Sequence, residues 1–492
     1  MADNGTSSSY GIFVEGTNIR NVTITGCTVY NYSQAGLQLD SAENCSISSL
    51  YAGGNGYGVR IEGGRNNSMV NSYAMNSNNT GIYLYDSDLA SMSNVYAQYN
   101  GYYGIMAISV DGIRLHRVFS IFNNETGVYV LGSGNLSGSQ VGYNEGSGVY
   151  VSCLDFNAYG NYFYNNGEDG FELSGASQNT NIFDNVAFEN SGAGFVIGRF
   201  FPGMDAVSIK VYNNTVANNT GPGIHFSNSR YSSVYNNTVY GCGGDGIYIG
   251  STRMQNNFTN NRVYNNTGHG FHLNYSNYSM ISGSEVYNNT VSGLYFAYSY
   301  YNAVNQTKSY TNGQYGFHLS YSTGNTLDMC NASKNGGGIK DGFHLASSHG
   351  TNMTNSYATQ SNNGFYLINS NSNRMQGCNS SANNVGFSLV GSSSTNSIYD
   401  CTASGNDING FAIAGSGASK ANSIQGSLAS QNEQYGFAIA SDSNGISNSV
   451  SSENRRDGFL ITGINNTLLN NTANGQARGV YVSGNNTLDR NS

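Results

Sequence analysis

A short signature, glycine followed by an apolar residue, any residue and a second apolar residue, recurs along the whole chain at near-constant spacing. Clear copies read Gly-Val-Arg-Ile from Gly58, Gly-Ile-Tyr-Leu from Gly81 and Gly-Val-Tyr-Val from Gly127. Variant copies extend the series from Gly11 to Gly479, which makes about 21 copies with a mean period of about 23 residues. Self-similarity at such a period is typical of a chain built from stacked repeats rather than from one globular core.

Each repeat holds two further short segments in which apolar and polar residues alternate, as in 256–259 and 262–266. Period-two alternation between Gly, Asn and Ser residues indicates strands. Three strands in about 23 residues describe one coil of a parallel β-solenoid. Helical repeats are excluded by the density of residues with low helix propensity, and a propeller blade needs nearly twice the period. We therefore expect an all-β, right-handed parallel β-helix of about 21 coils.

Stacked coils place equivalent residues about 4.8 Å apart, so like residues form columns. Phe occupies the first apolar position in eight repeats from Phe271 to Phe459, and Leu recurs at the second from Leu273 to Leu389. The leading Gly is expected either to adopt positive φ or to let neighbouring backbones approach closely. An Asn four residues before it, such as Asn266 or Asn289, is expected to bond to its counterpart in the next coil.

These columns resemble those of the secreted right-handed parallel β-helix families. The families include pectate lyases, polygalacturonases, NosD-like periplasmic proteins, and surface proteins of bacteria and archaea. The resemblance covers nearly the whole chain and implies one continuous domain over residues 1–492, with an irregular, longer coil near 194–223. It says little about activity, because one solenoid hosts many functions.

Composition excludes several functions. The net charge is −9 and only 10% of residues are charged, so nucleic-acid binding lacks the basic patch that it requires. No apolar run reaches 18 residues, and we expect no membrane span. The start Met1-Ala2-Asp3-Asn4 is interpreted as that of a mature or recombinant chain, so any export signal would already be absent.

The variable residue of the signature points outward and forms a column rich in Tyr and His. Aromatic residues are good strand formers, so strand packing alone accounts for such a column. A surface stripe that stacks on sugar rings or packs against another subunit is the functional alternative. Metal binding is a third interpretation, but only His318 and His344 are adjacent and no third ligand is evident, so no metal site is expected. The stripe comprises Tyr83, Tyr129, Tyr150, Tyr248, His272, Tyr295, His318, His344 and Tyr366.

Cysteines and Asn-x-Ser/Thr triplets are the residues that bear on the cellular compartment of the chain. Seven cysteines are too few for a disulfide scaffold. Cys378 and Cys401 fall in neighbouring coils at one position, where they serve either as small buried residues or as a candidate disulfide. Asn-x-Ser/Thr triplets arise by chance in an Asn-rich chain or mark a secreted, glycosylated surface. Candidate sites are Asn78, Asn124, Asn213, Asn236, Asn265, Asn288, Asn465 and Asn485.

An enzyme of these families needs converging charged groups. The segments that polygalacturonases carry are absent; the nearest is Gly268-His269-Gly270, which lacks the acid, so no catalytic residue is carried over. Paired carboxylates with a base support glycan cleavage or Ca²⁺ binding, whereas solvated acids beside a loop have no such role. The weak catalytic candidates are Glu168, Asp169, Glu172, Asp184, Asp205 and Lys210.

The repeat runs close to both ends of the chain, and neither end offers a capping helix. Uncovered coils favour end-to-end stacking between copies or continuation into a longer protein. We therefore expect an extracellular or cell-surface structural glycoprotein that associates with itself, as in a surface layer, sheath or filament, and that needs no cofactor. The first alternative is a carbohydrate-binding or polysaccharide-cleaving β-helix, active if at all as a lyase or glycoside hydrolase. The second is a NosD-like periplasmic accessory protein.

Overall fold

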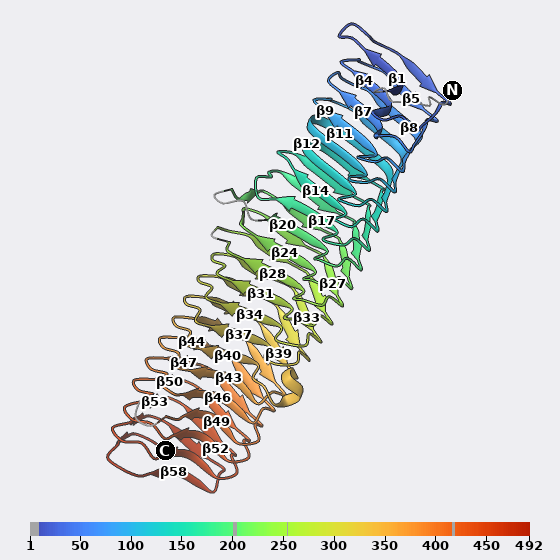
Figure 1. Cartoon of the computed structure of the whole chain (residues 1–492). Coiled ribbons are helices and arrows are strands. Elements are labelled where there is room, and N and C mark those ends of the chain that lie inside the picture. The colour runs from blue at the N-terminus through green and yellow to red at the C-terminus, as the bar shows by residue number, and fades with distance from the viewer. Residues whose placement is uncertain (1–8, 200–203, 253, 416–418) are drawn as a thin grey trace. The chain divides into compact units, whose positions relative to one another are not determined.

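The repeat predicted from the sequence forms one coil of a parallel β-solenoid in the computed structural model (Figure 1). The structure describes residues 9–199, 204–252, 254–415 and 419–492. They form two compact units, Met1–Gly244 and Asp245–Ser492, which are described separately below. The fold is an all-β parallel solenoid of about 21 coils with a period of about 23 residues, as predicted.

In unit 1, the Gly-apolar-x-apolar segments form the first strand of each coil. Each pairs in parallel with the first strand of the next coil, for example Val128 with Val149. These strands are β1 (Tyr10–Glu15), β4 (Ala35–Asp40), β7 (Tyr57–Glu62), β9 (Ile82–Tyr85), β11 (Ile105–Ile121), β12 (Val128–Ser137), β14 (Val149–Ser152), β17 (Phe171–Ser174), β20 (Phe195–Arg199) and β24 (Ile224–Ser227).

Unit 2 repeats this arrangement with shorter strands and regular register. A second and a third strand follow most first strands, as in β32 (Met280–Ser282) and β33 (Glu285–Tyr287). A 3₁₀ turn, η1 (Asn335–Gly338), precedes β40. The first strands are β28 (Ile247–Gly250), β31 (Phe271–Asn274), β34 (Leu294–Ala297), β37 (Phe317–Ser320), β40 (Phe343–Ala346), β43 (Asn363–Ile368), β46 (Val385–Val390), β49 (Asn409–Ile413), β52 (Tyr435–Ile439), β55 (Asp457–Ile461) and β58 (Arg478–Val482).

The core of unit 2 contains the predicted phenylalanine column. From Phe343 to Phe459, consecutive rings stack with centroids 4.7 or 4.8 Å apart, and all are fully buried. Burying one such side chain stabilises the fold by about 1.5–3 kcal/mol. The first strands are therefore anchored from inside, and only their alternate residues reach the surface.

Two polar features fix the corner before each first strand. The predicted asparagine ladder is confirmed: Asn266 donates to Asn289, Asn289 to Asn312 and Asn312 to Asn335, at 3.0, 3.0 and 3.1 Å. Of the two roles considered for the leading Gly, close approach is correct. A Cβ on Gly316 would lie 2.6 Å from the carbonyl oxygen of Gly342, and its φ is not positive. This spacing brings each corner close to the next coil.

Within the part of the chain that the structure describes, no helix is long and apolar enough to cross a membrane.

Candidate functional site

Six consecutive coils of unit 2 present a ring on the outer face of their first strand. We call Tyr248, His272, Tyr295, His318, His344 and Tyr366 the stripe. Neighbouring ring centroids are 4.8–5.1 Å apart and every ring is half-buried. The strand register lays these residues over one another, as the sequence predicts.

Rings in the stripe are turned relative to one another. Their interplanar angles run from 31° to 90°. In the column Tyr264, Tyr287 and Tyr310, on the third strands of the same coils, the angles are 2° and 3°. Rings in that column stack face to face, whereas successive rings in the stripe do not.

The residue immediately before each leading Gly adds a second row of side chains beside the stripe. His269 lies 4.5 Å from Tyr295 between ring centroids, and Tyr315 lies 4.2 Å from His344. Asp245 and Asp341 occupy the same position in their coils. Sequence reasoning missed this row because it followed the outward residues of the strands alone.

Each of these two aspartates holds a histidine of the stripe. The Nδ1 atom of His272 lies 2.8 Å from Asp245 Oδ2, and that of His344 lies 2.7 Å from Asp341 Oδ2. The other oxygen, Oδ1, accepts a backbone N–H from the next coil: that of His269 at 2.7 Å for Asp245, and that of Asn363 at 3.1 Å for Asp341. A carboxylate held in this way fixes the imidazole ring and leaves Nε2 as its unprotonated nitrogen in the neutral form.

Burial keeps two other histidines of this region uncharged. Burial, with the charges of His344 and His269, lowers the pKa of His318 to about 3. Burial also lowers the pKa of His269 to about 4, against the opposing effect of Asp245. At Asp245 burial acts to raise the pKa, but the bonds from His272 and His269 outweigh it and hold the pKa below its usual value. Near neutral pH His318 and His269 are therefore neutral rings.

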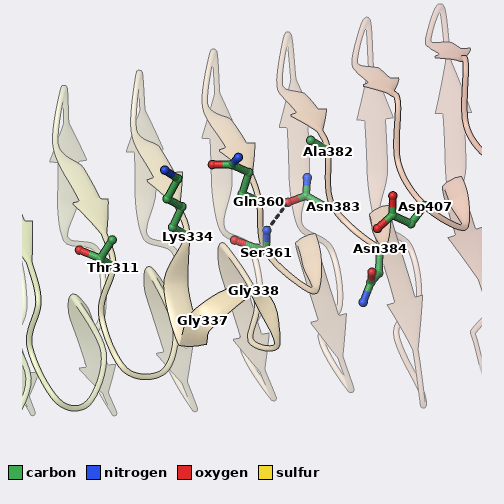
Figure 2. A pocket seen from close by; sticks show the side chains of 10 residues that line it. All are labelled: Thr311, Lys334, Gly337, Gly338, Gln360, Ser361, Ala382, Asn383, Asn384 and Asp407. Atoms are coloured by element: carbon green, nitrogen blue, oxygen red, sulfur yellow. Dashed lines mark hydrogen bonds between the residues drawn. The ribbon is translucent and has the colours of Figure 1, made fainter.

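A shallow groove lined mostly by polar residues follows the corner between the third and first strands of the later coils of unit 2 (Figure 2). Its volume is about 600 Å³, and Gly337 and Gly338 of the turn η1 are part of its lining. A neighbouring hollow of about 510 Å³ shares Asp407 and adds Glu433, Gln434, Arg455 and Arg456. The Lys340 ammonium lies 5.8 Å from the centroid of Tyr315, between η1 and the stripe. The lining of the groove is Thr311, Lys334, Gly337, Gly338, Gln360, Ser361, Ala382, Asn383, Asn384 and Asp407.

In unit 1 the predicted stripe residues Tyr83, Tyr129 and Tyr150 are also half-buried. Tyr129 and Tyr150 stack at 4.9 Å with an angle of 8°. Beyond them the outward position is taken by Glu172, whose side chain is 7% exposed. Tyr129 and Tyr150 thus form a segment of two rings next to the acidic Glu172, and Met106 separates them from Tyr83.

Of the six acidic or basic candidates in unit 1, only Asp169 and Glu172 converge on a common partner, Arg199. Arg199 Nη1 lies 3.3 Å from Asp169 Oδ2 and 2.6 Å from Glu172 Oε2. Burial raises the pKa of both carboxyl groups, and Arg199 opposes that rise. Arginine stays protonated, so these three side chains form an ion-pair cluster. A catalytic role for the two carboxyl groups stays a prediction.

The remaining candidates have separate surroundings. Ser147 donates to Glu168 at 3.3 Å, and Asp184 is exposed at a corner with φ of 55°. Asp205 lies 3.9 Å from Arg230. Lys210 lines a small hollow of about 360 Å³ with Asn179, Asn181, Ser208, Tyr231 and Ser233. The widened coil near 194–223 includes residues 200–203, which lie outside the described residues.

All eight candidate glycosylation asparagines are exposed. In seven triplets, such as Asn265-Asn266-Thr267, a second Asn follows, and Asn266 is a member of the buried ladder. Asn265 itself has φ of 56°, a conformation that Asn tolerates better than most residues. The solenoid corner thus accounts for the recurrence of these triplets, and their glycosylation stays a prediction.

All seven cysteines are free thiols, and Cys378 and Cys401 are both buried at the predicted inward position. A hydrogen bond between the two thiols lowers the pKa of Cys378 and raises that of Cys401. The bridge between them stays a prediction.

Comparison with known proteins gives two family matches. The model described as "right handed beta helix region" matches residues 10–159 and 203–341. The model described as "periplasmic copper-binding protein (NosD)" matches residues 328–492. No curated protein matches the chain.

Solved structures with a similar fold are distant in sequence. The catalytic domain of an α-1,3-glucanase in complex with tetrasaccharides is 14% identical, with 63% of this chain and 64% of that chain covered and a TM-score of 0.45. A periplasmic alginate epimerase is 15% identical, with 64% of this chain and 75% of that chain covered and a TM-score of 0.39. The A-module of a mannuronan C-5 epimerase from Azotobacter vinelandii is 12% identical, with 83% of this chain and 90% of that chain covered and a TM-score of 0.36.

Proposed function

Since the chain belongs to the family of right-handed β-helix regions, we propose that it binds a polysaccharide laid along the stripe of unit 2. One observation carries the proposal: six successive coils each present a half-buried ring at the same outward position, and no two successive rings of the stripe stack face to face. The coil spacing of about 4.8 Å is close to the length of one pyranose unit. A linear glycan can therefore meet one ring for each sugar along several coils.

The surroundings of the stripe suit such a ligand. Aromatic rings supply apolar surface for the C–H face of a sugar, while Tyr hydroxyls and imidazole nitrogens supply hydrogen bonds. Asp245 and Asp341 add acceptors at the edge of the stripe. The groove of Figure 2 adds amide, hydroxyl and charged side chains over later coils, where a longer chain can continue. A ligand rich in hydroxyl groups satisfies such partners better than an apolar one.

The proposal implies that the chain is extracellular or periplasmic, because such polysaccharides lie outside the cytoplasm. Self-association end to end stays a prediction, since nothing in the described residues or in the comparisons bears on it. The polysaccharide proposal is preferred to the structural role because it has a defined surface, the stripe.

Binding is tested by comparing Tyr295→Ala with Tyr287→Ala on a polysaccharide panel of neutral and uronic-acid polymers. Tyr295 lies in the stripe and Tyr287 in the stacked column of the third strands, so the two substitutions remove the same side chain from different faces. We expect Tyr295→Ala to weaken binding by roughly 3- to 10-fold, the equivalent of about 0.5–1.5 kcal/mol for one aromatic contact. Tyr287→Ala should leave the affinity unchanged. Absence of binding to every polymer, or equal losses in both variants, would contradict the proposal.

The match to the NosD model over residues 328–492 favours a second candidate, a periplasmic accessory protein that binds copper. His344 lies in the matched segment and His318 just before it. Titration of the chain with Cu²⁺ tests this candidate. Unchanged copper affinity in the double variant His318→Ala, His344→Ala would remove these two histidines from the copper site.

A further inference from the structure

We propose that Asp245, His269 and His272 form a binding site for one divalent transition-metal ion, with Zn²⁺ as its probe. The site does not rest on polysaccharide binding and lies outside the segment that matches the NosD model.

The three side chains come from two successive coils. Asp245 precedes the leading Gly of one coil, His269 precedes that of the next, and His272 is the outward residue of β31. One donor atom of each residue lies within 4.8 Å of the donors of the other two. Among the described residues, this is the one group of three such side chains at that spacing.

Two imidazoles and a carboxylate suit a borderline divalent ion. Zn²⁺ binds His nitrogen and Asp oxygen at about 2.0–2.2 Å, so ligand atoms around it lie about 3.4 Å apart. His272 Nδ1 and Asp245 Oδ2 are 2.8 Å apart, and His269 completes the triangle within 4.8 Å. Side-chain movements of about 1 Å bring the three ligand atoms to the spacing that they have around Zn²⁺. A set of two histidines and one carboxylate also leaves coordination positions for water or a ligand.

The backbone already orients the carboxylate. Asp245 Oδ1 accepts the N–H of His269 at 2.7 Å, which fixes the plane in which Oδ2 meets His272. The side chains of His272 and Asp245 are 19% and 16% exposed, so an ion reaches them from solvent. Metal binding displaces the hydrogen bond between His272 Nδ1 and Asp245 Oδ2 at 2.8 Å, and the proton of His272 moves to Nε2. Where His269 binds through Nδ1, it also gives up the bond that it accepts from the N–H of Ser292 at 3.3 Å.

A second carboxylate–imidazole pair, without a third metal ligand beside it, lies further along unit 2. Asp341 and His344 lie three residues apart in one coil, with Asp341 at the place of His269, and are 2.7 Å apart. The place of Asp245, in the preceding coil, is taken by Tyr315, a phenol whose pKa is raised by burial. A protonated phenol is a poor metal ligand, so this pair is the internal control.

Replacements are taken from the repeats of the chain itself, so that each fits its position. His272→Tyr copies Tyr295, His269→Ser copies Ser292, and Asp245→Asn keeps an oxygen that accepts the N–H of His269. His344→Tyr is the control and copies Tyr366. Circular dichroism and the thermal midpoint of each metal-free variant show whether the solenoid is intact.

The full chain, freed of metal with a chelator, is titrated with Zn²⁺ by calorimetry and by competition with a chromophoric chelator. We expect one Zn²⁺ per chain with micromolar or tighter affinity, a thermal midpoint that rises with Zn²⁺, and no binding of Ca²⁺, which prefers oxygen ligands. Each of the three variants should weaken Zn²⁺ binding at least 10-fold, and His344→Tyr should leave it unchanged. No saturable binding would overturn the proposal. So would an equal loss in His344→Tyr, or full affinity in His272→Tyr.

Discussion

Asp169 in unit 1 and Asp245 and Asp341 in unit 2 occupy one position of the repeat, yet their surroundings differ. Each uses Oδ1 to accept a backbone N–H from the next coil. In unit 1 the second oxygen meets Arg199, and in unit 2 it meets His272 or His344. The solenoid therefore supplies an oriented carboxylate, and the outward residues nearby decide whether it joins an ion pair or holds an imidazole ring.

The unit 1 cluster gives the largest expected effect. Arg199→Ala leaves Asp169 and Glu172 without their cation, although their side chains are only 10% and 7% exposed. Removing one partner of a buried pair costs about 3–5 kcal/mol, and since the Arg199 side chain is 54% exposed we expect roughly 1–3 kcal/mol at pH 7. Urea unfolding measures the loss. An unchanged unfolding free energy would show that the carboxyl groups are already neutral.

The pH dependence of the same variant sharpens this comparison. Burial raises the pKa of Asp169 and Glu172 above their unfolded values, so the folded state binds more protons. Stability linked to these groups is then complete below the unfolded pKa and is lost as the pH rises through the folded pKa. We expect Arg199→Ala to regain stability as the pH falls from 7 to 4.

In unit 2 the stability linked to a buried histidine changes with pH in the opposite direction. Burial lowers the pKa of His318 to about 3, with Tyr295, Tyr315 and His344 packed around it, so the unfolded state binds more protons between about pH 6.5 and 3. Stability linked to His318 is therefore lost as the pH falls through this range, on the order of 1–3 kcal/mol by pH 4. His318→Tyr, which copies Tyr295 and Tyr366, should remove this acid sensitivity. Unfolding curves at pH 7 and 4 test it, and equal acid losses in both proteins would refute it.

Asp341→Asn should give the smallest effect. The amide oxygen still accepts the N–H of Asn363, and only the charged contact to His344 is lost. We expect a loss of about 0.5–1 kcal/mol in unfolding free energy, measured by urea unfolding. A loss as large as that in Arg199→Ala would show that His344 depends on the carboxylate for packing.

The fold follows from the sequence because every repeat contributes the same columns. The Phe column, the asparagine ladder and the stripe are all relations between residues one period apart, and periodicity predicts such relations directly. Periodicity does not predict contacts between different positions of the repeat. His272 meets Asp245, 27 residues earlier, and Arg199 meets Glu172, also 27 residues earlier.

Such contacts depend on how tightly the corner before the first strand turns, which the period does not reveal. For this reason the ion pairs of Arg199 with Asp169 and Glu172, and the contacts of Asp245 and Asp341 with histidines, were not predicted. Asp205 lies near Arg230, and Lys210 lines a separate hollow. The residue before each leading Gly was the available signal, since acids and histidines recur there at Asp169, Asp245, His269 and Asp341.

The most direct test of polysaccharide binding is an NMR titration of the histidine side chains with an oligosaccharide from a polymer that the chain binds. His272, His318 and His344 lie in the stripe, while His116 on β11 and His349 lie outside it. The proposal predicts that the resonances of the three stripe histidines shift and saturate together, while those of His116 and His349 stay in place. Saturable shifts at His116 or His349, with none in the stripe, would contradict it.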